Sequence, residues 1–390
     1  MRFRSSMPII ATALFATLAL LFSALRAVGQ EETFSKIKNI YVPGLSANNP
    51  FFFDISFVDP VTDLYLVSDV SNKSLDVIQA STGNFLFQVP GFTGVNLANF
   101  DLTHLGPDGV VTVNHTEAWV GDGDSTVKVI DLIARTITDV ITTGGTTRAD
   151  EMAYDPRDHV ILVANPDEGS RTPPQPPFVS LISTRTHKIL NQIKFPNATG
   201  GIEQPSWSPR TGLFYVSIPQ FNNDPGESGV AVISPRSLKL LKIFETSNCS
   251  PNGSALGPDD QLLLGCSGTG NDTIVINIRS GATLKVFDQV TGSDEVWFNP
   301  GDGHYYVTAN AFGPTPTAFL GVIDADELKF DGTVPTSGGS HSVAADPVTN
   351  QIFVPLSFDP NDPQCANGCI GVYLASGGSR DDRVEGSDQR

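Results

Sequence analysis

The chain has 390 residues, of which 17% are charged, and it contains 36 glycines and 28 prolines. This composition is typical of many short strands joined by tight turns and argues against a mainly helical fold. The formal net charge is −18. A surface of that sign repels nucleic acid and anionic lipid and suits cations or neutral ligands, so we expect no nucleic-acid partner.

Residues 1–29 have the pattern of a secretory signal peptide. A basic start is followed by an apolar run from Ile9 to Leu25 and by the small residues Ala27-Val28-Gly29. The alternative is a membrane anchor, but a run of about 17 residues is at the short end for a span. We therefore predict a secreted, extracellular protein with no membrane attachment after cleavage. Removing three arginines and no acids takes the net charge of the mature chain to −21.

One sequence motif recurs along residues 30–375. It consists of a polar residue, a short apolar stretch, a pair ending in proline, a turn and then an alternating strand. The clearest copies begin at Asp54, Asp150, Glu203, Asn252, Asp294 and His341. Consecutive copies lie roughly 40–55 residues apart, which is the period of a β-propeller blade. The sequence therefore predicts an all-β fold, a single seven-bladed β-propeller of four-stranded antiparallel blades.

In the first blade we expect strands at residues 54–58, 63–68, 74–79 and 84–89. The second blade lacks a proline between its first two strands and allows two registers. One starts at Gly109, with Asp108 beside it, and the other uses Asp101-Leu-Thr-His-Leu-Gly-Pro107. The spacing to the next strand favours Gly109. The long loops between the second and third strands are predicted to surround the mouth at which the first strands begin.

The two ends of the propeller are predicted to close on each other. The last blade has a third strand at residues 369–375 but no fourth, and residues 36–43 form an outer strand with no blade before it. Completing the last blade with the N-terminal strand removes two exposed sheet edges. Residues 376–390 are polar, and we expect a disordered tail.

The four cysteines are Cys249, Cys266, Cys365 and Cys369. An even number in an oxidising compartment favours disulfides. Cys249 and Cys266 flank a predicted hairpin, and Cys365 and Cys369 can close a small loop. The alternative, a metal site of four thiolates, would need thiols from different blades. Glycosylation is expected at sequons that include Asn72, Asn114, Asn197 and Asn271.

Superposing the repeats places their first residues in a ring around one axis. Most of these residues are Asp, Glu or Asn, and their carboxylate and amide oxygens suit Ca²⁺ or another divalent cation. We expect the cation ligands to be Glu203, Asn252, Asp294, Asp54 and Asp150. His341 can carry a proton near neutral pH and is a candidate catalytic residue.

Three alternatives stay open at the ring. Polar residues at these positions can simply end a strand and bond to neighbouring blades. The register is uncertain by one residue, so Glu151 or Glu295 can face the axis instead. Trp207 and Trp297 lie inside first strands, and we expect them to pack between blades rather than to bind a ligand.

Short motifs resemble two groups of propellers. Glu203-Gln-Pro-Ser-Trp207 and Pro251-Asn-Gly253 resemble elements of gluconolactonase-like (senescence-marker-protein) propellers, in which the Glu and the Asn are metal ligands. Asp294 falls where that group has an Asp that is both ligand and base. The whole repeat, with endings such as Tyr306-Val-Thr-Ala-Asn310, resembles seven-bladed YVTN-type and lactonase-like propellers. The gluconolactonase-like group has six blades with its Glu in the first, whereas Glu203 lies in the fourth of seven.

The resemblance implies hydrolysis of a lactone or related cyclic ester. In such an enzyme a divalent cation polarises the carbonyl, and a carboxylate or His341 activates water. The alternatives are a non-catalytic extracellular binding propeller and a propeller lyase or isomerase. In each case the expected partner is a small-molecule or carbohydrate-like ligand, and the protein is expected to be a monomer.

Overall fold

A computed structural model describes residues 33–166, 175–267, 272–309 and 318–376. The predicted signal peptide, residues 377–390 of the predicted tail and the sequon at Asn271 lie outside these residues. Ser376, predicted to begin the disordered tail, is instead the last residue of a strand, Cys369–Ser376, and its hydroxyl is 2.7 Å from that of Thr33. Residues Phe34–Leu374 form one compact unit. Within the described residues, no helix is long and apolar enough to cross a membrane.

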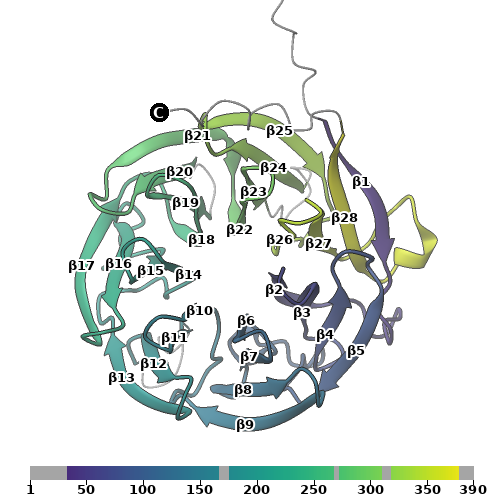
Figure 1. Cartoon of the computed structure of the whole chain (residues 1–390), viewed down its shortest axis with the longest axis horizontal. Coiled ribbons are helices and arrows are strands. Elements are labelled where there is room, and N and C mark those ends of the chain that lie inside the picture. The colour runs from purple at the N-terminus through teal and green to yellow at the C-terminus, as the bar shows by residue number, and fades with distance from the viewer. Residues whose placement is uncertain (1–32, 167–174, 268–271, 310–317, 377–390) are drawn as a thin grey trace, which may run out of the picture. The chain divides into compact units, whose positions relative to one another are not determined.

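The unit is a ring of seven four-stranded antiparallel sheets, and the first strand of each sheet lies nearest the axis (Figure 1). Blades one and two comprise β2 (Phe53–Asp59), β3 (Leu64–Asp69), β4 (Ser74–Gln79) and β5 (Phe85–Pro90), then β6 (Val110–Val113), β7 (Glu117–Asp122), β8 (Thr126–Asp131) and β9 (Thr136–Thr142). Blades three and four comprise β10 (Met152–Asp155), β11 (Val160–Asn165), β12 (Phe178–Ser183) and β13 (Lys188–Lys194), then β14 (Pro205–Ser208), β15 (Leu213–Ile218), β16 (Ser228–Ser234) and β17 (Lys239–Thr246). Blades five and six comprise β18 (Pro251–Leu256), β19 (Gln261–Cys266), β20 (Asp272–Asn277) and β21 (Thr283–Thr291), then β22 (Ser293–Asn299), β23 (His304–Ala309), β24 (Phe319–Asp324) and β25 (Lys329–Pro335). Blade seven comprises β26 (Ala344–Ala345), β27 (Ile352–Leu356), β28 (Cys369–Ser376) and β1 (Thr33–Ile40).

The predicted strands of blade one agree with β2 to β5 within one residue at each end. In blade two the strand begins at Val110, and Leu102–His104 is a short 3₁₀ turn. The register that starts at Gly109 is therefore confirmed. This turn is capped by the Asp101 side chain, which accepts a hydrogen bond from the Thr103 backbone N–H and so holds this stretch out of the sheet.

The hydrophobic core lies between neighbouring blades. One cluster joins Leu66 and Val77 of blade one to Val120 and Ile130 of blade two, and similar clusters join other neighbouring pairs. The inner three strands of most blades are almost wholly buried, whereas the outer strands alternate or are mostly exposed. Each blade therefore gains stability mainly from its neighbours, as expected of a repeat protein.

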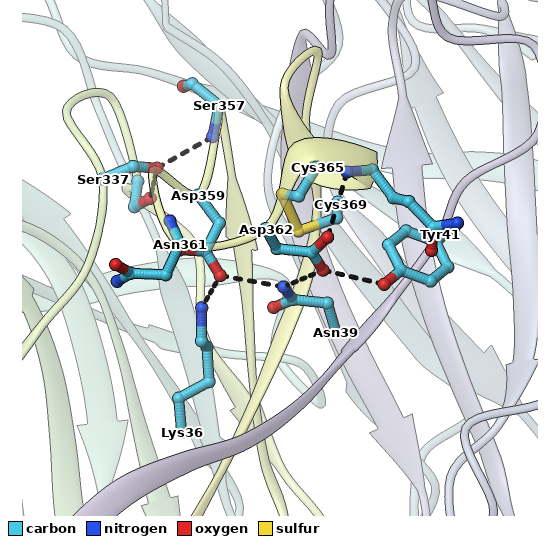
Figure 2. The surroundings of a disulfide bond; sticks show 12 residues. Lys36, Asn39, Tyr41, Ser337, Ser357, Asp359, Asn361, Asp362, Cys365 and Cys369 are labelled. Carbon is cyan, nitrogen blue, oxygen red and sulfur yellow. Dashed lines mark hydrogen bonds and ion pairs between the residues drawn. A yellow bond between two sulfur atoms is a disulfide. The ribbon is translucent and has the colours of Figure 1, made fainter.

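The ring closes through β1, which pairs with β28. Three side chains of the N-terminal segment then hold the loop that precedes β28 (Figure 2). Lys36 forms an ion pair with Asp359, the Asn39 amide donates to Asp359 at 2.9 Å and to Asp362 at 2.8 Å, and the Tyr41 hydroxyl donates to Asp362 at 2.7 Å. The predicted closure by the N-terminal strand is thus accompanied by polar contacts between residues more than 300 positions apart in the chain.

Both predicted cysteine pairs are within disulfide distance. Cys249–Cys266 has its Cα atoms 5.0 Å apart, and Cys365–Cys369, in the loop of Figure 2, has them 5.2 Å apart. No free cysteine is left among the described residues. Two disulfides are compatible with an extracellular protein.

The sequon asparagines in the described residues differ in accessibility. Asn114 and Asn197 are exposed, whereas the Asn72 amide nitrogen donates hydrogen bonds to the Pro43 carbonyl at 2.9 Å and to Asp69 at 2.6 Å. Asn114 and Asn197 are therefore better placed than Asn72 to carry a glycan.

Candidate functional site

Polar side chains from different blades meet where the innermost strands begin. We call this group the polar ring; it consists of Asp54, Asp108, Arg148, Asp150, Glu203, Asn252, Asp294 and His341. Each residue lies at or just before the first strand of its blade. Contacts between side chains of different blades, described below, place the group around the axis.

Arg148 lies among three carboxylates of the ring. Its guanidinium Nη2 is 2.9 Å from Asp150 Oδ2, and its Nη1 is 3.8 Å from Asp54 Oδ2 and 3.9 Å from Asp108 Oδ1. Because carboxylates this close repel one another, a cation is required for them to be ionised together. Arg148 supplies part of that positive charge.

Arg148 is not part of the repeated motif and is not predicted by it. A signal was present, because Arg148 precedes the ring residue Asp150 by two positions in a chain with only 24 lysines and arginines. Residues two apart in an extended segment point to the same side. A search of the segments before each first strand for cations would have found it.

His341 is held between a carboxylate and an aromatic ring. Its Nδ1 lies 2.8 Å from the Gly339 carbonyl, its Nε2 lies 3.5 Å from Asp54 Oδ1, and its ring stacks on Phe53 at 4.9 Å. Burial lowers the pKa of His341, but the contact with Asp54 and the charges of Asp294 and Asp54 outweigh burial and raise the pKa to about 9. His341 therefore carries a proton at neutral pH and is an acid or a positive charge there, not a base.

The ring carboxyls differ in acidity. Burial opposes the ionisation of Asp54, yet the contact with His341 and the charge of Arg148 hold its pKa below the usual value. Asp108 is fully buried, and burial together with the charges of Asp150 and Asp54 raises its pKa well above the usual range. Burial also raises the pKa of Asp294, although His341 and Asn252 partly offset this effect.

The structure brings some of the predicted cation ligands together. Asn252 Nδ2 donates to Asp294 Oδ1 at 3.3 Å, while Asn252 Oδ1 accepts from Ser267 at 2.9 Å. Glu203 is on the neighbouring blade, and its charge acts on Glu151. Asp54 and Asp150 lie instead with Asp108 around Arg148.

Glu151 and Glu295 form a deeper layer under the ring. Gln204 Nε2 donates to Glu295 Oε2 at 2.5 Å, and the Glu151 carboxyl shares a hydrogen bond with that of Glu295. These side chains come from blades three, four and six, so they can meet only across the axis. The doubt about register is thereby resolved, because Asp150 and Asp294 belong to the ring and the residue after each belongs to this layer.

Both glutamates are buried: Glu151 is 6% exposed and Glu295 is 4% exposed. Burial, and to a smaller extent the charge of the neighbouring Glu295, raises the pKa of Glu151 well above its usual range. Burial raises the pKa of Glu295 to about 8. At neutral pH the pair therefore retains a proton. We call Glu151, Gln204 and Glu295 the partition.

Two groups of described residues have the donor atoms and spacing to hold a metal ion. Asp54, Asp108 and Asp150 each offer an oxygen within 4.8 Å of the others, and so do the donor atoms of His304, Asp324 and Asp331. Hard oxygen donors of the first group fit Ca²⁺ or Mg²⁺, but the Arg148 guanidinium already contacts all three. The second group lies away from the ring, in β23 to β25, where His304 is 3.4 Å from Asp331.

A large cavity lies on the axis beyond the partition. It has a volume of about 800 Å³ and is lined by the innermost strands of blades one to six and by the turns that follow some of them. Trp207 and Trp297 contact inter-blade cores, as expected, but both also line this cavity. The expectation that they serve packing alone was therefore incomplete.

Comparison with known proteins identifies the architecture. A chain of the structure titled "Crystal Structure of Mitotic Checkpoint Complex" matches with a TM-score of 0.62 and 11% sequence identity, covering 87% of this chain and 93% of that chain. The chain has a seven-bladed β-propeller fold. No family model matches it, and no curated protein matches its sequence. Because 1626 chains of solved structures match, the fold does not indicate a particular function.

Proposed function

We propose that the protein is a secreted hydrolase that opens a lactone or a related cyclic ester at the polar ring. The observation that carries the proposal is the convergence of acidic groups of unequal acidity with two cationic groups, Arg148 and His341, at one end of the axis. Ester hydrolysis needs a base for the attacking water and positive charge for the developing oxyanion. Residues 1–29 and the two disulfides support secretion.

In this proposal the ring residues have separate roles. Asp294, which accepts a hydrogen bond from Asn252, is the base that takes a proton from water. The oxygen of this water adds to the carbonyl carbon, and protonated His341 and Arg148 stabilise the negative charge on the carbonyl oxygen. The ring C–O bond then breaks, and Asp294 returns the proton to the leaving alkoxide oxygen. Asp54 is a positioning residue, because it lies between Arg148 and His341 and holds both.

A divalent cation is a second source of positive charge in the proposal. Asp54, Asp108 and Asp150 would hold it, and bound Ca²⁺ would act as a Lewis acid on the substrate carbonyl. The Arg148 guanidinium would have to leave these carboxylates, since both cations need the same oxygens. Glu203, Asn252 and Asp294 remain the ligand set that the family resemblance implies.

The test is a panel of γ- and δ-lactones assayed with purified mature protein, with and without EDTA, and combined with metal analysis. We expect hydrolysis by the wild type and a 10²- to 10⁴-fold lower kcat/KM for Asp294→Asn, about the contribution of a general base. The matched control is Asp302→Asn in the same blade, where Asp302 accepts from Tyr306 at 2.6 Å away from the ring. This variant is expected to hydrolyse at the wild-type rate.

Each arm has an outcome that contradicts the proposal. The absence of hydrolysis across the panel, or full activity of Asp294→Asn, would refute a hydrolase at this site. Full activity in EDTA with no bound metal would refute the cation and leave Arg148 and His341 as the electrophilic groups. Product mass separates hydrolysis, which adds one water, from lyase or isomerase chemistry, which adds none.

A second candidate, a non-catalytic binding propeller, is favoured by the charge balance of the ring. Arg148 and protonated His341 already neutralise part of the acidic cluster, as in a site built to recognise a polar ligand such as a carbohydrate. Recovery of the bound ligand chemically unchanged, with no effect of EDTA, would support this candidate over the first.

A further inference from the structure

The axial cavity is separated from the polar ring by the partition. Gln204 lines the cavity, its Nε2 donates to Glu295, and its Oε1 accepts from the Ser254 backbone N–H at 2.6 Å. Both ends of the Gln204 amide are thus engaged. The cavity extends from this level to exposed residues at the opposite end of the innermost strands, among them Pro60, Asn114 and Pro156.

Aromatic side chains make up much of the cavity wall. They are Phe57, Tyr154, Trp207, Trp297 and Phe298, from blades one, three, four and six. All five are only partly buried although they lie near the axis. Large apolar surface left open in a concave site, with few polar groups, is typical of small-molecule binding sites.

The polar groups of the wall are mostly engaged with one another. The Ser56 hydroxyl is 3.0 Å from that of Ser342, and the Ser206 hydroxyl is 2.9 Å from the Ser254 carbonyl. These bonds run between neighbouring blades. Because these hydroxyl groups already form hydrogen bonds within the protein, they are less available to bind a ligand.

The Asp and His side chains of the wall are also engaged with each other. Among the described residues that line the cavity, the titratable groups are Asp59, His115 and Tyr154. Asp59 is 1% exposed, and its carboxylate lies 2.9 Å from His115 Nδ1 and accepts from the Val61 backbone N–H at 3.0 Å. Asp59 and His115 are hydrogen-bonded to each other, so the wall offers no uncommitted charged group to a charged ligand, whose desolvation would be unfavourable.

We propose that this cavity is a second binding site, distinct from the polar ring, for an uncharged and mainly apolar small molecule that enters between the turns after the innermost strands. The volume of about 800 Å³ falls within the range of small-molecule sites, roughly 300–1,000 Å³. The occupant contacts Trp207 and Trp297 directly. This proposal does not depend on hydrolysis at the ring.

The three tryptophans of the chain make a contact assay possible. Trp207 and Trp297 line the cavity, whereas Trp119 is completely buried in the core between blades. A brominated aromatic quenches tryptophan fluorescence only at contact. The probe is neutral 4-bromobiphenyl, and its matched charged analogue is 4′-bromobiphenyl-4-carboxylate.

We expect saturable quenching by 4-bromobiphenyl with one site per chain and at least tenfold weaker binding of the carboxylate. The double variant Trp207→Phe/Trp297→Phe, which retains Trp119, should lose the quenching. Thr112→Phe, which fills part of the cavity, should weaken binding at least tenfold. Asp294→Asn in the ring should bind the probe like the wild type.

Several results would overturn the proposal. They are quenching that rises linearly without saturation, equal binding of the two probes, and equal quenching of the Trp119-only protein. Should Thr112→Phe fail to fold by circular dichroism, the double tryptophan variant and the probe pair still decide the question.

Discussion

The two ends of the propeller axis are built on the innermost strands of the blades but differ in chemistry. At the start of the innermost strands, carboxylates, Arg148 and His341 contact one another. At the other end lies an aromatic cavity of about 800 Å³, whose Asp59 and His115 side chains are hydrogen-bonded to each other. Between them lies the partition, in which Glu151 and Glu295 meet across the axis.

The difference shows how a propeller can separate two chemical environments along one axis. Nearby positions of one strand can carry polar or apolar side chains. One layer of side chains is therefore enough for the lining of the axis to change from polar to apolar. A buried carboxyl pair that retains a proton adds less charge to the apolar side than two carboxylates would. The contrast predicts that pH and ions act on one end of the axis and that apolar ligands act on the other.

The largest expected effect is a loss of stability with rising pH, caused by the partition and the polar end. Glu295 has a folded pKa of about 8 against an ordinary 4.5, so the free energy of unfolding falls as pH rises from 4.5 to 8. His341 has a folded pKa of about 9 against an ordinary 6.5, so its stabilisation is complete below pH 6.5 and is lost as pH rises through 9. Each group contributes a slope of up to about 1.4 kcal/mol per pH unit.

Urea unfolding at pH 6.5 and pH 8 measures this slope. Glu295→Gln and His341→Gln should each flatten it. His115→Asn at the rim of the cavity is the matched control, because the His115 side chain is 52% exposed and lies at the other end. A slope that survives both ring and partition substitutions would contradict the assignment of the titrating groups to the partition and the polar end.

The second effect is the loss of the internal cation. Arg148→Ala should lower the free energy of unfolding by about 3 kcal/mol, because it leaves buried carboxylates without their partner. Arg236→Ala, whose side chain is 81% exposed and 3.7 Å from Asp158, should change it by less than about 0.5 kcal/mol. Equal urea midpoints for the two variants would argue against a role of Arg148 in charge balance.

Adding Ca²⁺ to the Arg148→Ala variant tests whether the same carboxylates bind a metal ion. If Asp54, Asp108 and Asp150 accept a divalent ion once the guanidinium is absent, Ca²⁺ at about a hundred times its Kd should restore about 2.7 kcal/mol to Arg148→Ala. Magnesium and sodium at matched ionic strength are the comparison ions. A variant that Ca²⁺ does not stabilise would show that these carboxylates are not a calcium site.

The smallest effect is the coupling between the two ends. Stabilisation by 4-bromobiphenyl in the cavity and by a ring ligand should add to within about 0.5 kcal/mol, because sites without shared partners are usually independent. Glu295→Ala, which removes a member of the partition, should increase the coupling. Strong coupling in the wild type would show that the partition does not separate the ends.

Most of the architecture could be predicted because it rests on local signals. The period of the repeat gave the seven blades, the spacing of Cys249 and Cys266 around a hairpin gave one disulfide, and the unpaired strand at residues 36–43 gave the closure. The strands of blade one needed only alternation and turn residues. Each of these features involves residues of one blade or an edge that has a single available partner.

The candidate site could be predicted only in part. The repeat placed Asp54, Asp150, Asp294 and His341 at the same level of the axis, but it did not indicate Arg148, which lies just before its blade's repeat. It left open whether Asp150 or Glu151 faces the axis, and the structure uses both, at two depths. It assigned Trp207 and Trp297 to packing, although both also line the cavity.

The sequence by itself determined the number of blades, the order of their strands and the strand that closes the ring, and it favoured the two cysteine pairs that the structure contains. These follow from periodic patterning and turn chemistry, which act over a few residues or one repeat. Only the tertiary structure decided that Glu151 meets Glu295, that Arg148 reaches Asp54, and that five aromatic side chains share one cavity. These contacts join blades that are not all neighbours, so they depend on the width of the axis and on side-chain reach rather than on any spacing along the chain.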